Sequence, residues 1–412
     1  MSRFGYPLAA AAAVAALALA LNPARADVVT DWNQTALDAS AAETPQTSWR
    51  VLAMAHGAVF DAMNAIARGY KPYLIQPPVP SGASQGAAAA TAAHGVLLAL
   101  YPAQKVKLDA ALKTSLAAVP DGAAKEDGAT LGRLVAEKYI AARANDGADR
   151  KVDFTPGSKP GQWRPAPPSM APFASVFWSQ VTPFVLTSAL EVPAPGPLAL
   201  DSEQYAKEID EVRRLGARNS TERSADQTAA AIFSLIKGPE LWSAAARASA
   251  AAKGTTPIEN ARIFALMSMA TMDATVAGWA IKKQYPTWRP ITAIREAGSR
   301  ADPNWEPLLL TPSHPDYVSG HCITAGATVR TLTRLFGGDG VRFSATYGGP
   351  FGLTRSYSGF AQAEKEIEDA RVWAGIHTRT ADVHGGIVGH KIADLVVERA
   401  MTPLAVGSVQ TQ

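Results

Sequence analysis

The stretch Tyr317-Val318-Ser319-Gly320-His321 stands just before a long, largely apolar run without proline, residues 323–336. Such a run is typical of a helix. Ser319 and Gly320 are therefore predicted at its N-terminus, where backbone N–H groups lack partners and the helix dipole is positive. Gly320 lets a ligand approach the backbone, and Ser319 adds a hydroxyl. Two interpretations follow: an anion-binding cradle with His321 beside it, or an ordinary Ser/Gly helix cap.

Residues 1–26 have the pattern of a secretory signal peptide. Arg3 provides the positive start, residues 8–21 form an Ala/Leu core, and Ala24-Arg25-Ala26 is a small-x-small cleavage site. The core is short for a bilayer span, so an exported chain is expected rather than one held by an uncleaved anchor. No further apolar segment of membrane length follows. The prediction is a periplasmic or secreted protein without a membrane span in the mature chain.

Composition excludes some classes of protein. Hydrophobic residues make up 47% of the 412 residues and the net charge is only +3, so a full core is expected. There is no run of lysines and arginines, which argues against nucleic acid as the main partner. The single cysteine, Cys322, excludes an internal disulfide. A small buried hydrophobic residue is the favoured interpretation of Cys322 over a redox group.

Apolar residues recur at helical spacing through most of the chain, which predicts an all-α fold of helical bundles. The expected division is a helical region with a connection at 27–200, a second helical region at 201–402 and a tail at 403–412. His56 lies in the first helix and is expected to be a hydrogen-bonded structural group. The predicted helices, in addition to 323–336, are 48–66, 85–100, 104–118, 123–144, 203–215, 225–236, 241–252, 258–281 and 384–399.

Residues 154–197 interrupt the helical pattern. They are rich in proline, with Trp163 and Trp178 between the prolines. A long, mostly irregular connection on the surface of the helices is predicted. Long loops are often functional, so this one is either a lid or wall of a site or a structural wrap.

Basic residues gather at the end of the predicted helix 258–281. Pro286 disfavours helix at Tyr285, which places Lys282 in the last turn and Arg289 on the following turn, before Pro290. Taken alone, this is an ordinary basic helix end. Two further segments carry charges or imidazoles: the rigid lead Thr311-Pro312-Ser313-His314-Pro315-Asp316, and Arg371-Val372-Trp373-Ala374-Gly375-Ile376-His377. Arg371 and His377 can face one site if Gly375 bends the backbone.

Three motifs, Lys-x6-Arg-Pro, Ser-Gly-His and Arg-x5-His, occur in this order at Lys282, Ser319 and Arg371. Together they resemble the vanadium-dependent haloperoxidase and type 2 phosphatidic acid phosphatase superfamily. The segments 31–33, 56–66 and 288–295 are similar to its exported bacterial haloperoxidase-like branch. The resemblance covers most of 27–402 and implies an all-α fold, in agreement with the periodicity.

The resemblance also implies roles for individual residues. Lys282, Arg289 and Arg371 would surround a vanadate or phosphate, with hydrogen bonds from Ser319 and Gly320. His321 would be the acid/base, and His377 would be the vanadium ligand or the phosphate-accepting nucleophile. Three fixed cations suit an anion with two to three negative charges, and arginine offers paired donors to its oxygens. Val318, Ala370 and Thr378 depart from the family pattern, which affects the shape of the pocket rather than its charged groups.

Four functions are compatible with these residues. The favoured one is a vanadate-dependent haloperoxidase that oxidises halide with hydrogen peroxide. The alternative is an acid phosphatase that hydrolyses phosphate esters through phosphohistidine in the same pocket. A zinc hydrolase based on His377, His384 and His390 lacks a His-Glu-x-x-His motif. A non-catalytic oxyanion-binding protein would not need His321, and a homo-oligomer is compatible with any of these functions.

His314 is a candidate for halide selectivity. It lies seven residues before His321, where chloride oxidisers of the family resemble one another in carrying phenylalanine and bromide oxidisers carry histidine. The resemblance therefore implies a preference for bromide or iodide over chloride. The alternative is that His314 points to solvent or caps a turn.

Overall fold

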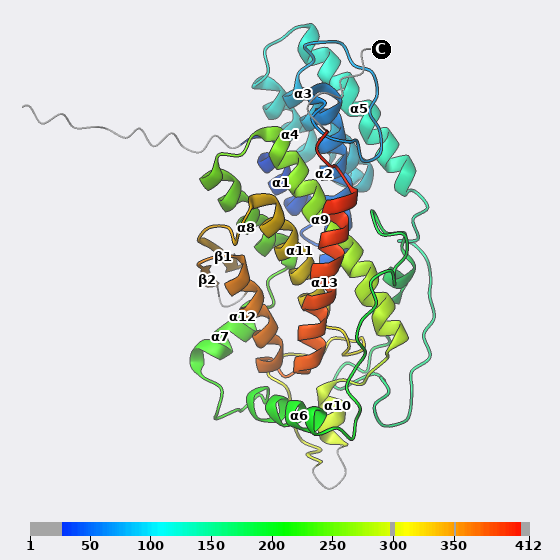
Figure 1. Cartoon of the computed structure of the whole chain (residues 1–412), viewed down its shortest axis with the longest axis vertical. Coiled ribbons are helices and arrows are strands. Elements are labelled where there is room, and N and C mark those ends of the chain that lie inside the picture. The colour runs from blue at the N-terminus through cyan, green and yellow to red at the C-terminus, as the bar shows by residue number, and fades with distance from the viewer. Residues whose placement is uncertain (1–26, 297–300, 350–351, 405–412) are drawn as a thin grey trace, which may run out of the picture.

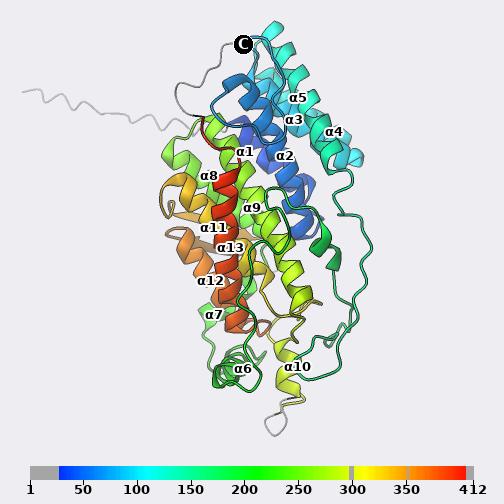
Figure 2. The same ribbon diagram turned by 45° about the vertical axis from the view of Figure 1, so that its right-hand side comes forward.

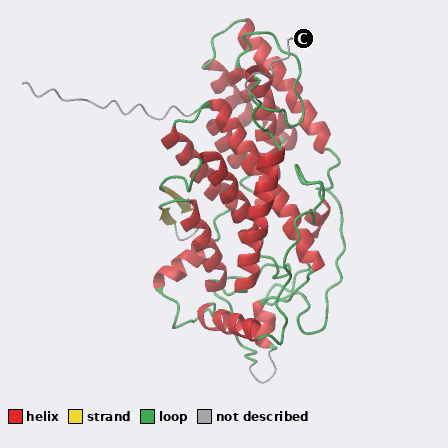
Figure 3. Ribbon diagram, in the orientation of Figure 1, coloured by secondary structure: helices red, strands yellow, loops and turns green. Residues whose placement is uncertain are grey.

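The computed structural model describes residues 27–296, 301–349 and 352–404. The predicted signal peptide and most of the predicted tail lie outside this part of the chain. Within it the secondary structure is helical apart from one small hairpin, as Figure 3 shows. The predicted all-α class is therefore confirmed.

The first half of the fold is a bundle that contains α2 and the helices packed around it (Figure 1). Small residues let these helices approach closely. A Cβ on Gly132 of α5 would lie 2.4 Å from the carbonyl oxygen of Ala88 in α3, so the two backbones are in contact. The helices of this half are α1 (Val28–Ala39), α2 (Pro45–Ala67), α3 (Gln85–Leu100), α4 (Lys105–Ala117) and α5 (Ala123–Arg143).

The second half is built on α9, α11 and α13, with shorter helices around them. Glycine again allows close contact, because a Cβ on Gly389 of α13 would lie 2.2 Å from the carbonyl oxygen of Ile323 in α11. The helices are α6 (Glu203–Leu215), α7 (Ala225–Phe233), α8 (Gly238–Lys253), α9 (Pro257–Gln284), α10 (Pro290–Arg295), α11 (Gly320–Phe336), α12 (Phe360–Trp373) and α13 (Arg379–Arg399). An antiparallel hairpin, β1 (Phe343–Tyr347) and β2 (Leu353–Tyr357), joins α11 to α12 and was not predicted from the sequence.

Helix α9 connects the two halves. It packs against α2 on one side and against α11 and α13 on the other, so one hydrophobic core continues across both halves. In the described chain it is the single helix long and apolar enough to cross a membrane, and its apolar window is completely buried. Here α9 is the central core helix of the bundle.

Two buried aspartates attach loops to the long helices in the same way. Asp61 of α2 accepts hydrogen bonds from the backbone N–H groups of residues 73–75. Asp273 of α9 accepts them from the backbone N–H groups of residues 184–186. Each carboxylate satisfies three amides that would otherwise lack partners at the surface of the core. The parallel between the two helices is consistent with a weak symmetry of the two halves.

The proline-rich connection descends along one side of the second half, as Figures 1 and 2 show. It contains a short 3-10 helix, η2 (Val176–Gln180), and it is anchored by a cluster of aromatic side chains. Trp163 and Phe173 are buried, with ring centroids 5.5 Å apart. The backbone also reaches the site region, because the N–H of Ala174 donates to the carbonyl oxygen of Ser313 over 2.7 Å. The segment is therefore a packed structural wrap.

Candidate functional site

The seven residues predicted to surround an anion come together at one end of α11. Lys282 lies in the last turn of α9, Arg289 is the residue before α10, and Arg371 lies in the last turn of α12. His377, the last of the seven, lies 95 positions after Lys282, the first. We call Lys282, Arg289, Ser319, Gly320, His321, Arg371 and His377 the anion pocket.

The three cations of the anion pocket are fully or almost fully buried, with exposures of 0, 1 and 2% for Lys282, Arg289 and Arg371. Lys282 Nζ donates to the carbonyl oxygen of Pro315 over 2.6 Å. Arg289 Nε donates to the carbonyl oxygen of His314 over 2.6 Å. Burial lowers the pKa of Lys282 well below its usual value and that of Arg289 to about 10. Three clustered cations are costly in a desolvated site, and a bound anion would offset that cost.

The N-terminus of α11 does not use Ser319 as a cap. Ser319 occupies the N-cap position, but its side chain makes no capping hydrogen bond. Its Oγ is buried and makes no hydrogen bond of normal geometry among the described residues, although it lies close enough to Cys322 and Asp382 to lower the pKa of both groups. The neighbouring Gly320 faces Trp279, whose ring atoms would lie 3.5 Å from a Cβ at this position. The ordinary helix-cap interpretation therefore does not account for the Ser319 hydroxyl.

His377 reaches the anion pocket because the chain turns sharply after α12. Gly375 has a φ of +78°, and a Cβ there would lie 2.4 Å from the carbonyl oxygen of Gly216, so glycine is required twice over. Because of this turn, the side chains of Arg371 and His377 both line the same cavity. His377 is 1% exposed, and its Nδ1 lies 2.6 Å from Asp316 Oδ1.

The imidazole of His377 is held from both sides. Because Asp316 accepts from Nδ1–H, Nε2 keeps its lone pair, and Arg289 Nη1 donates to Nε2 over 3.1 Å. Burial raises the pKa of Asp316 to about 6. Burial, followed by the positive charge of Arg289, lowers the pKa of His377 well below its usual value. His377 is therefore neutral, with an unprotonated Nε2, as an axial ligand or a nucleophile must have.

His321 and His314 face the same cavity. Burial is the main cause that lowers the pKa of each, and the surrounding cations lower it further. His314 Nδ1 lies 3.0 Å from Arg289 Nη2, and its ring centroid lies 5.5 Å from that of Trp279. The alternative that His314 points to solvent or only caps a turn does not fit this position.

A cavity leads to the anion pocket from the junction of the two halves. Its empty volume is about 680 Å³, part of which is open to solvent. His314, His321, Arg371 and His377 line it together with Gly320. Apolar and aromatic residues line the rest, among them Trp49, Ile236, Leu241, Trp242 and Trp279.

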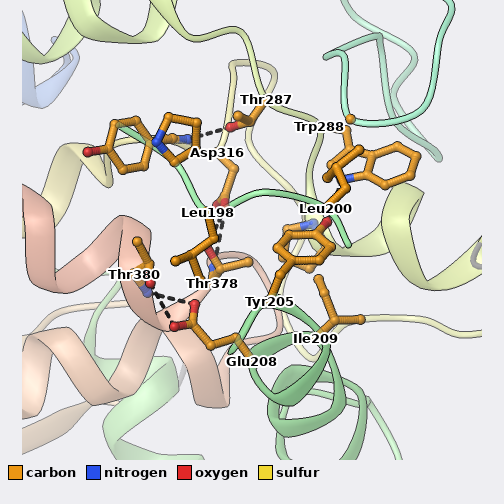
Figure 4. A pocket seen from close by; sticks show the side chains of 14 residues that line it. Leu198, Leu200, Tyr205, Glu208, Ile209, Thr287, Trp288, Asp316, Thr378 and Thr380 are labelled. Carbon is orange, nitrogen blue, oxygen red and sulfur yellow. Dashed lines mark hydrogen bonds between the residues drawn. The ribbon is translucent and has the colours of Figure 1, made fainter. Parts of the chain in front are cut away.

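A second cavity, of about 410 Å³ including open space, lies on the other side of Asp316 (Figure 4). Asp316 lines it, and Thr378 Oγ1 donates to Asp316 Oδ2 over 2.7 Å. Glu208 of α6 accepts from both the N–H and the hydroxyl of Thr380. No cation of the anion pocket lines this second cavity, so its walls support Asp316 from behind and do not offer a further anion site.

Several supporting residues were not predicted from the sequence. Asp316 appeared there only as part of a rigid lead, yet it holds His377. Ser234 Oγ accepts from Arg371 Nη1 over 2.8 Å, and no motif marks this serine. Asp382 is fully buried beside Cys322, whose thiol donates to Asp382 Oδ1 over 3.3 Å, and burial raises the pKa of this carboxyl well above its usual value. The spacing of Asp316 before Ser-Gly-His is the one signal that sequence reasoning had available.

The remaining histidines are used elsewhere. His384 Nδ1 lies 2.9 Å from the hydroxyl of Tyr317, and His390 Nε2 lies 2.7 Å from Glu364 Oε1. The described residues contain no group of three or more His, Cys, Asp or Glu side chains suited to a metal ion. The zinc-hydrolase interpretation therefore has no site in this part of the chain. His56 is buried and lies 3.1 Å from Asn33 Nδ2, as a structural histidine would.

The donors of the anion pocket fit a tetrahedral oxyanion such as vanadate. Arg371 Nε is a buried donor without a hydrogen-bond partner among the described residues, and the buried Ser319 Oγ makes no hydrogen bond of normal geometry there. Buried donors in this condition are rare unless a ligand or water uses them. Together with three cations and the unprotonated Nε2 of His377, they offer charge, hydrogen bonds and one nitrogen ligand.

The comparisons with known proteins agree with this fold. Residues 262–405 match the model of the VCPO second helical-bundle domain. A vanadium chloroperoxidase of Curvularia inaequalis is 28% identical over a match that covers 35% of this chain and 29% of that protein. The match therefore spans less than a third of the relative's length.

Solved structures share the whole architecture. A bacterial vanadium-dependent iodoperoxidase superposes with a TM-score of 0.78 at 24% identity, covering 91% of this chain and 95% of the other. A bacterial vanadium-dependent chloroperoxidase in its holo form gives 0.71 at 18% identity, covering 86% and 92%. These superpositions show that the chain has the same helical fold as the bacterial vanadium-dependent peroxidases.

Proposed function

We propose that this protein is a vanadate-dependent haloperoxidase that oxidises halide with hydrogen peroxide, with bromide favoured over chloride. One observation carries the proposal: three buried cations and the unpartnered Arg371 Nε lie in one pocket with the unprotonated Nε2 of His377, to which Arg289 Nη1 donates. The relatives and neighbours named for vanadium peroxidases support it.

In this proposal Lys282, Arg289 and Arg371 bind the negative charge of vanadate. Ser319 Oγ and the backbone at Gly320 donate hydrogen bonds to its oxygens, and His377 Nε2 is the protein ligand to vanadium. Bound vanadate would supply the Lewis-acidic centre at which hydrogen peroxide becomes open to attack by halide, without a change of metal oxidation state. Asp316 keeps the proton of His377 on Nδ1, so Nε2 remains a ligand.

His321 is proposed as the acid/base. It lines the cavity that leads in from solvent, and its lowered pKa keeps it neutral in the absence of an anion. A neutral imidazole can accept a proton from incoming hydrogen peroxide and return it to a leaving oxygen. A bound anion would raise its pKa towards the working range, because opposite charge favours the protonated imidazole.

The same residues would serve an acid phosphatase, with His377 Nε2 as nucleophile and His321 as the acid for the leaving oxygen. The test is to assay the purified apo-protein in parallel for aryl-phosphate hydrolysis and for bromination of a phenolic dye with vanadate and peroxide. Vanadate-dependent bromination that His377→Ala abolishes supports the proposal. Hydrolysis without any bromination would replace it with the phosphatase function.

We also propose that the protein is exported to the periplasm or beyond, because a secreted oxidant is compatible with sparse cysteine.

A further inference from the structure

The two arginines of the anion pocket are held in different ways. Arg289 lies 3.9 Å from Asp316 Oδ1, whereas Arg371 forms no ion pair with the described residues and is held by a serine. Arg371 Nη1 donates to Ser234 Oγ over 2.8 Å and lies 3.5 Å from the carbonyl oxygen of the same residue. Arg371 Nε has no partner in the described part of the chain. One nitrogen of this guanidinium is therefore anchored, and Nε is left for a ligand.

The hydroxyl of Ser234 can only accept a hydrogen bond from Arg371, because its own hydrogen is already used. Ser234 Oγ donates to the carbonyl oxygen of Ala231 over 2.6 Å, and the side chain is completely buried. A hydroxyl has one hydrogen and two lone pairs, so the remaining capacity of this oxygen is that of an acceptor. The lone pairs of Ser234 Oγ therefore fix the position of Arg371 Nη1.

Ser234 is also the C-cap of α7, so Arg371 faces the negative end of that helix. The partial charges of the last carbonyl groups offset part of the cost of burying a guanidinium. A carboxylate in the same place would form a buried ion pair and neutralise the arginine. With a serine and a helix end as its partners, Arg371 keeps most of its positive charge for a bound anion.

The hairpin β1–β2 holds α7 against α12, the helix that carries Arg371 (Figure 1). Arg355 of β2 contacts both helices. Its Nη1 donates to Asp226 Oδ1 of α7 over 2.8 Å, and its Nη2 donates to Glu366 Oε2 of α12 over 2.5 Å. Asp226 lies in the first turn of α7 and Ser234 at its end. The hairpin therefore fixes one end of α7 while the other end holds Arg371.

We propose that Ser234 is a positioning residue of the anion pocket, which turns Arg371 Nε towards a bound tetrahedral oxyanion without neutralising the guanidinium. The inference rests on the proposed function in one respect, since it requires that the anion pocket binds vanadate or phosphate. A guanidinium that is already held at Nη1 loses less conformational freedom when an anion binds. Loss of the serine hydroxyl should therefore weaken anion binding although Ser234 does not touch the anion.

The test measures binding of phosphate and of vanadate to the apo-protein by isothermal titration calorimetry. Ser234→Thr and Ser234→Val introduce side chains of the same shape, of which only threonine keeps the hydroxyl. The threonine variant should bind both anions within about threefold of the unmodified protein, and the valine variant about tenfold more weakly. Ser249→Ala is the matched control, because Ser249 is an equally buried serine of α8 that does not line the cavity. Its anion affinity should equal that of the unmodified protein.

A double-mutant cycle with Arg371→Met separates positioning from a merely structural role. Ser234→Ala should weaken anion binding about tenfold in the unmodified protein and cause no further loss in Arg371→Met, because the serine acts through the arginine. Neither substitution adds volume, so the cycle remains decisive if threonine and valine disturb folding. An equal loss in both backgrounds, or equal affinities of the threonine and valine variants, would overturn the inference.

The outcomes also separate this inference from the proposed function. Phosphate binding that depends on the hydroxyl of Ser234, without any vanadate-dependent halide oxidation, would overturn the function and support the inference. Halide oxidation by a protein whose threonine and valine variants bind anions equally well would support the function and overturn the inference.

Discussion

Asp316 Oδ1 lies 2.6 Å from Nδ1 of His377, inside a site where both side chains are almost completely buried. The pairing fixes which imidazole nitrogen carries the proton and leaves Nε2 directed at Arg289. The same carboxylate also forms an ion pair with Arg289, at 3.9 Å. Asp316 is therefore a positioning residue for the proposed vanadium ligand.

Asp316→Asn should weaken vanadate binding about 10–100-fold, as is usual for partners that orient a metal-binding histidine. The amide group is isosteric, but its NH₂ would donate to Nδ1 and place the proton on Nε2. Vanadate affinity of the purified variant is the measurement. Asp302→Asn, a change at an exposed aspartate, is the control. Affinity equal to that of the unmodified protein would show that His377 does not need Asp316.

Arg289→Ala should weaken vanadate binding at least tenfold, because it removes a charge-assisted donor worth roughly 1.5–3 kcal/mol. Arg289 also donates to the carbonyl oxygens of His314 and Ile376, so the free energy of unfolding should fall as well. Arg289→Lys keeps the charge but not the paired donors, and its affinity should lie between the two. Arg334→Ala, at a surface ion pair with Asp394, is the control. If Arg289→Ala binds vanadate as tightly as the unmodified protein, Arg289 does not contact the bound anion.

The sequence predicted most of this fold because helix signals are local. Pro286 ended α9 where expected, and Ser224 caps α7 with a capping box. The residues of the anion pocket were predicted as a set because charged and imidazole groups at fixed spacing form recognisable motifs. The hairpin β1–β2 was missed because its strands are short and lie among polar residues. Ser234 was missed because its contact with Arg371 spans 137 positions, and nothing in either segment indicates the other.

The contribution of His56 to the stability of the apo-protein should fall as the pH falls below about 6.5. Burial, with a smaller contribution from Arg247, lowers the pKa of His56 to about 3 in the folded protein. Between the pKa of His56 in the unfolded chain and its lower pKa in the folded protein, only the unfolded chain binds the proton. The free energy of unfolding therefore falls with decreasing pH in this range. His56→Gln should flatten the profile by roughly 1.4 kcal/mol per pH unit between about pH 6 and 4. The other buried groups titrate both in the unmodified protein and in His56→Gln, so their contributions cancel in the difference between the two profiles.

The control for His56 is His390, a histidine whose pKa is shifted in the opposite direction. The hydrogen bond to Glu364 raises the pKa of His390, so His390 stabilises the fold at low pH and the contribution is lost as the pH rises through its folded pKa. His390→Gln should therefore lower the free energy of unfolding by a constant amount below about pH 6.5 and leave its slope between about pH 6 and 4 unchanged. Denaturant unfolding across this range measures both variants. An unchanged slope in His56→Gln would mean that His56 is protonated in the folded protein.

His314→Phe should raise the ratio of chloride to bromide oxidation. The ring of His314 lines the cavity beside His321. Its Nδ1 accepts a hydrogen bond from Arg289 Nη2 over 3.0 Å. Phenylalanine would remove this acceptor and release Nη2 for the bound anion, which should withdraw electron density from the oxidising centre and favour the halide that is harder to oxidise. The ring contact with Trp279, 5.5 Å between centroids, can be kept by phenylalanine, so the fold should be preserved.

Rates with both halides between about pH 4 and 8 give the ratio and separate it from a protonation effect of the lost imidazole. His314→Gln is the matched variant, since it keeps a hydrogen-bond acceptor and should leave the ratio near its original value. A ratio that does not move in His314→Phe would remove His314 as a selector and leave the anion pocket unaffected.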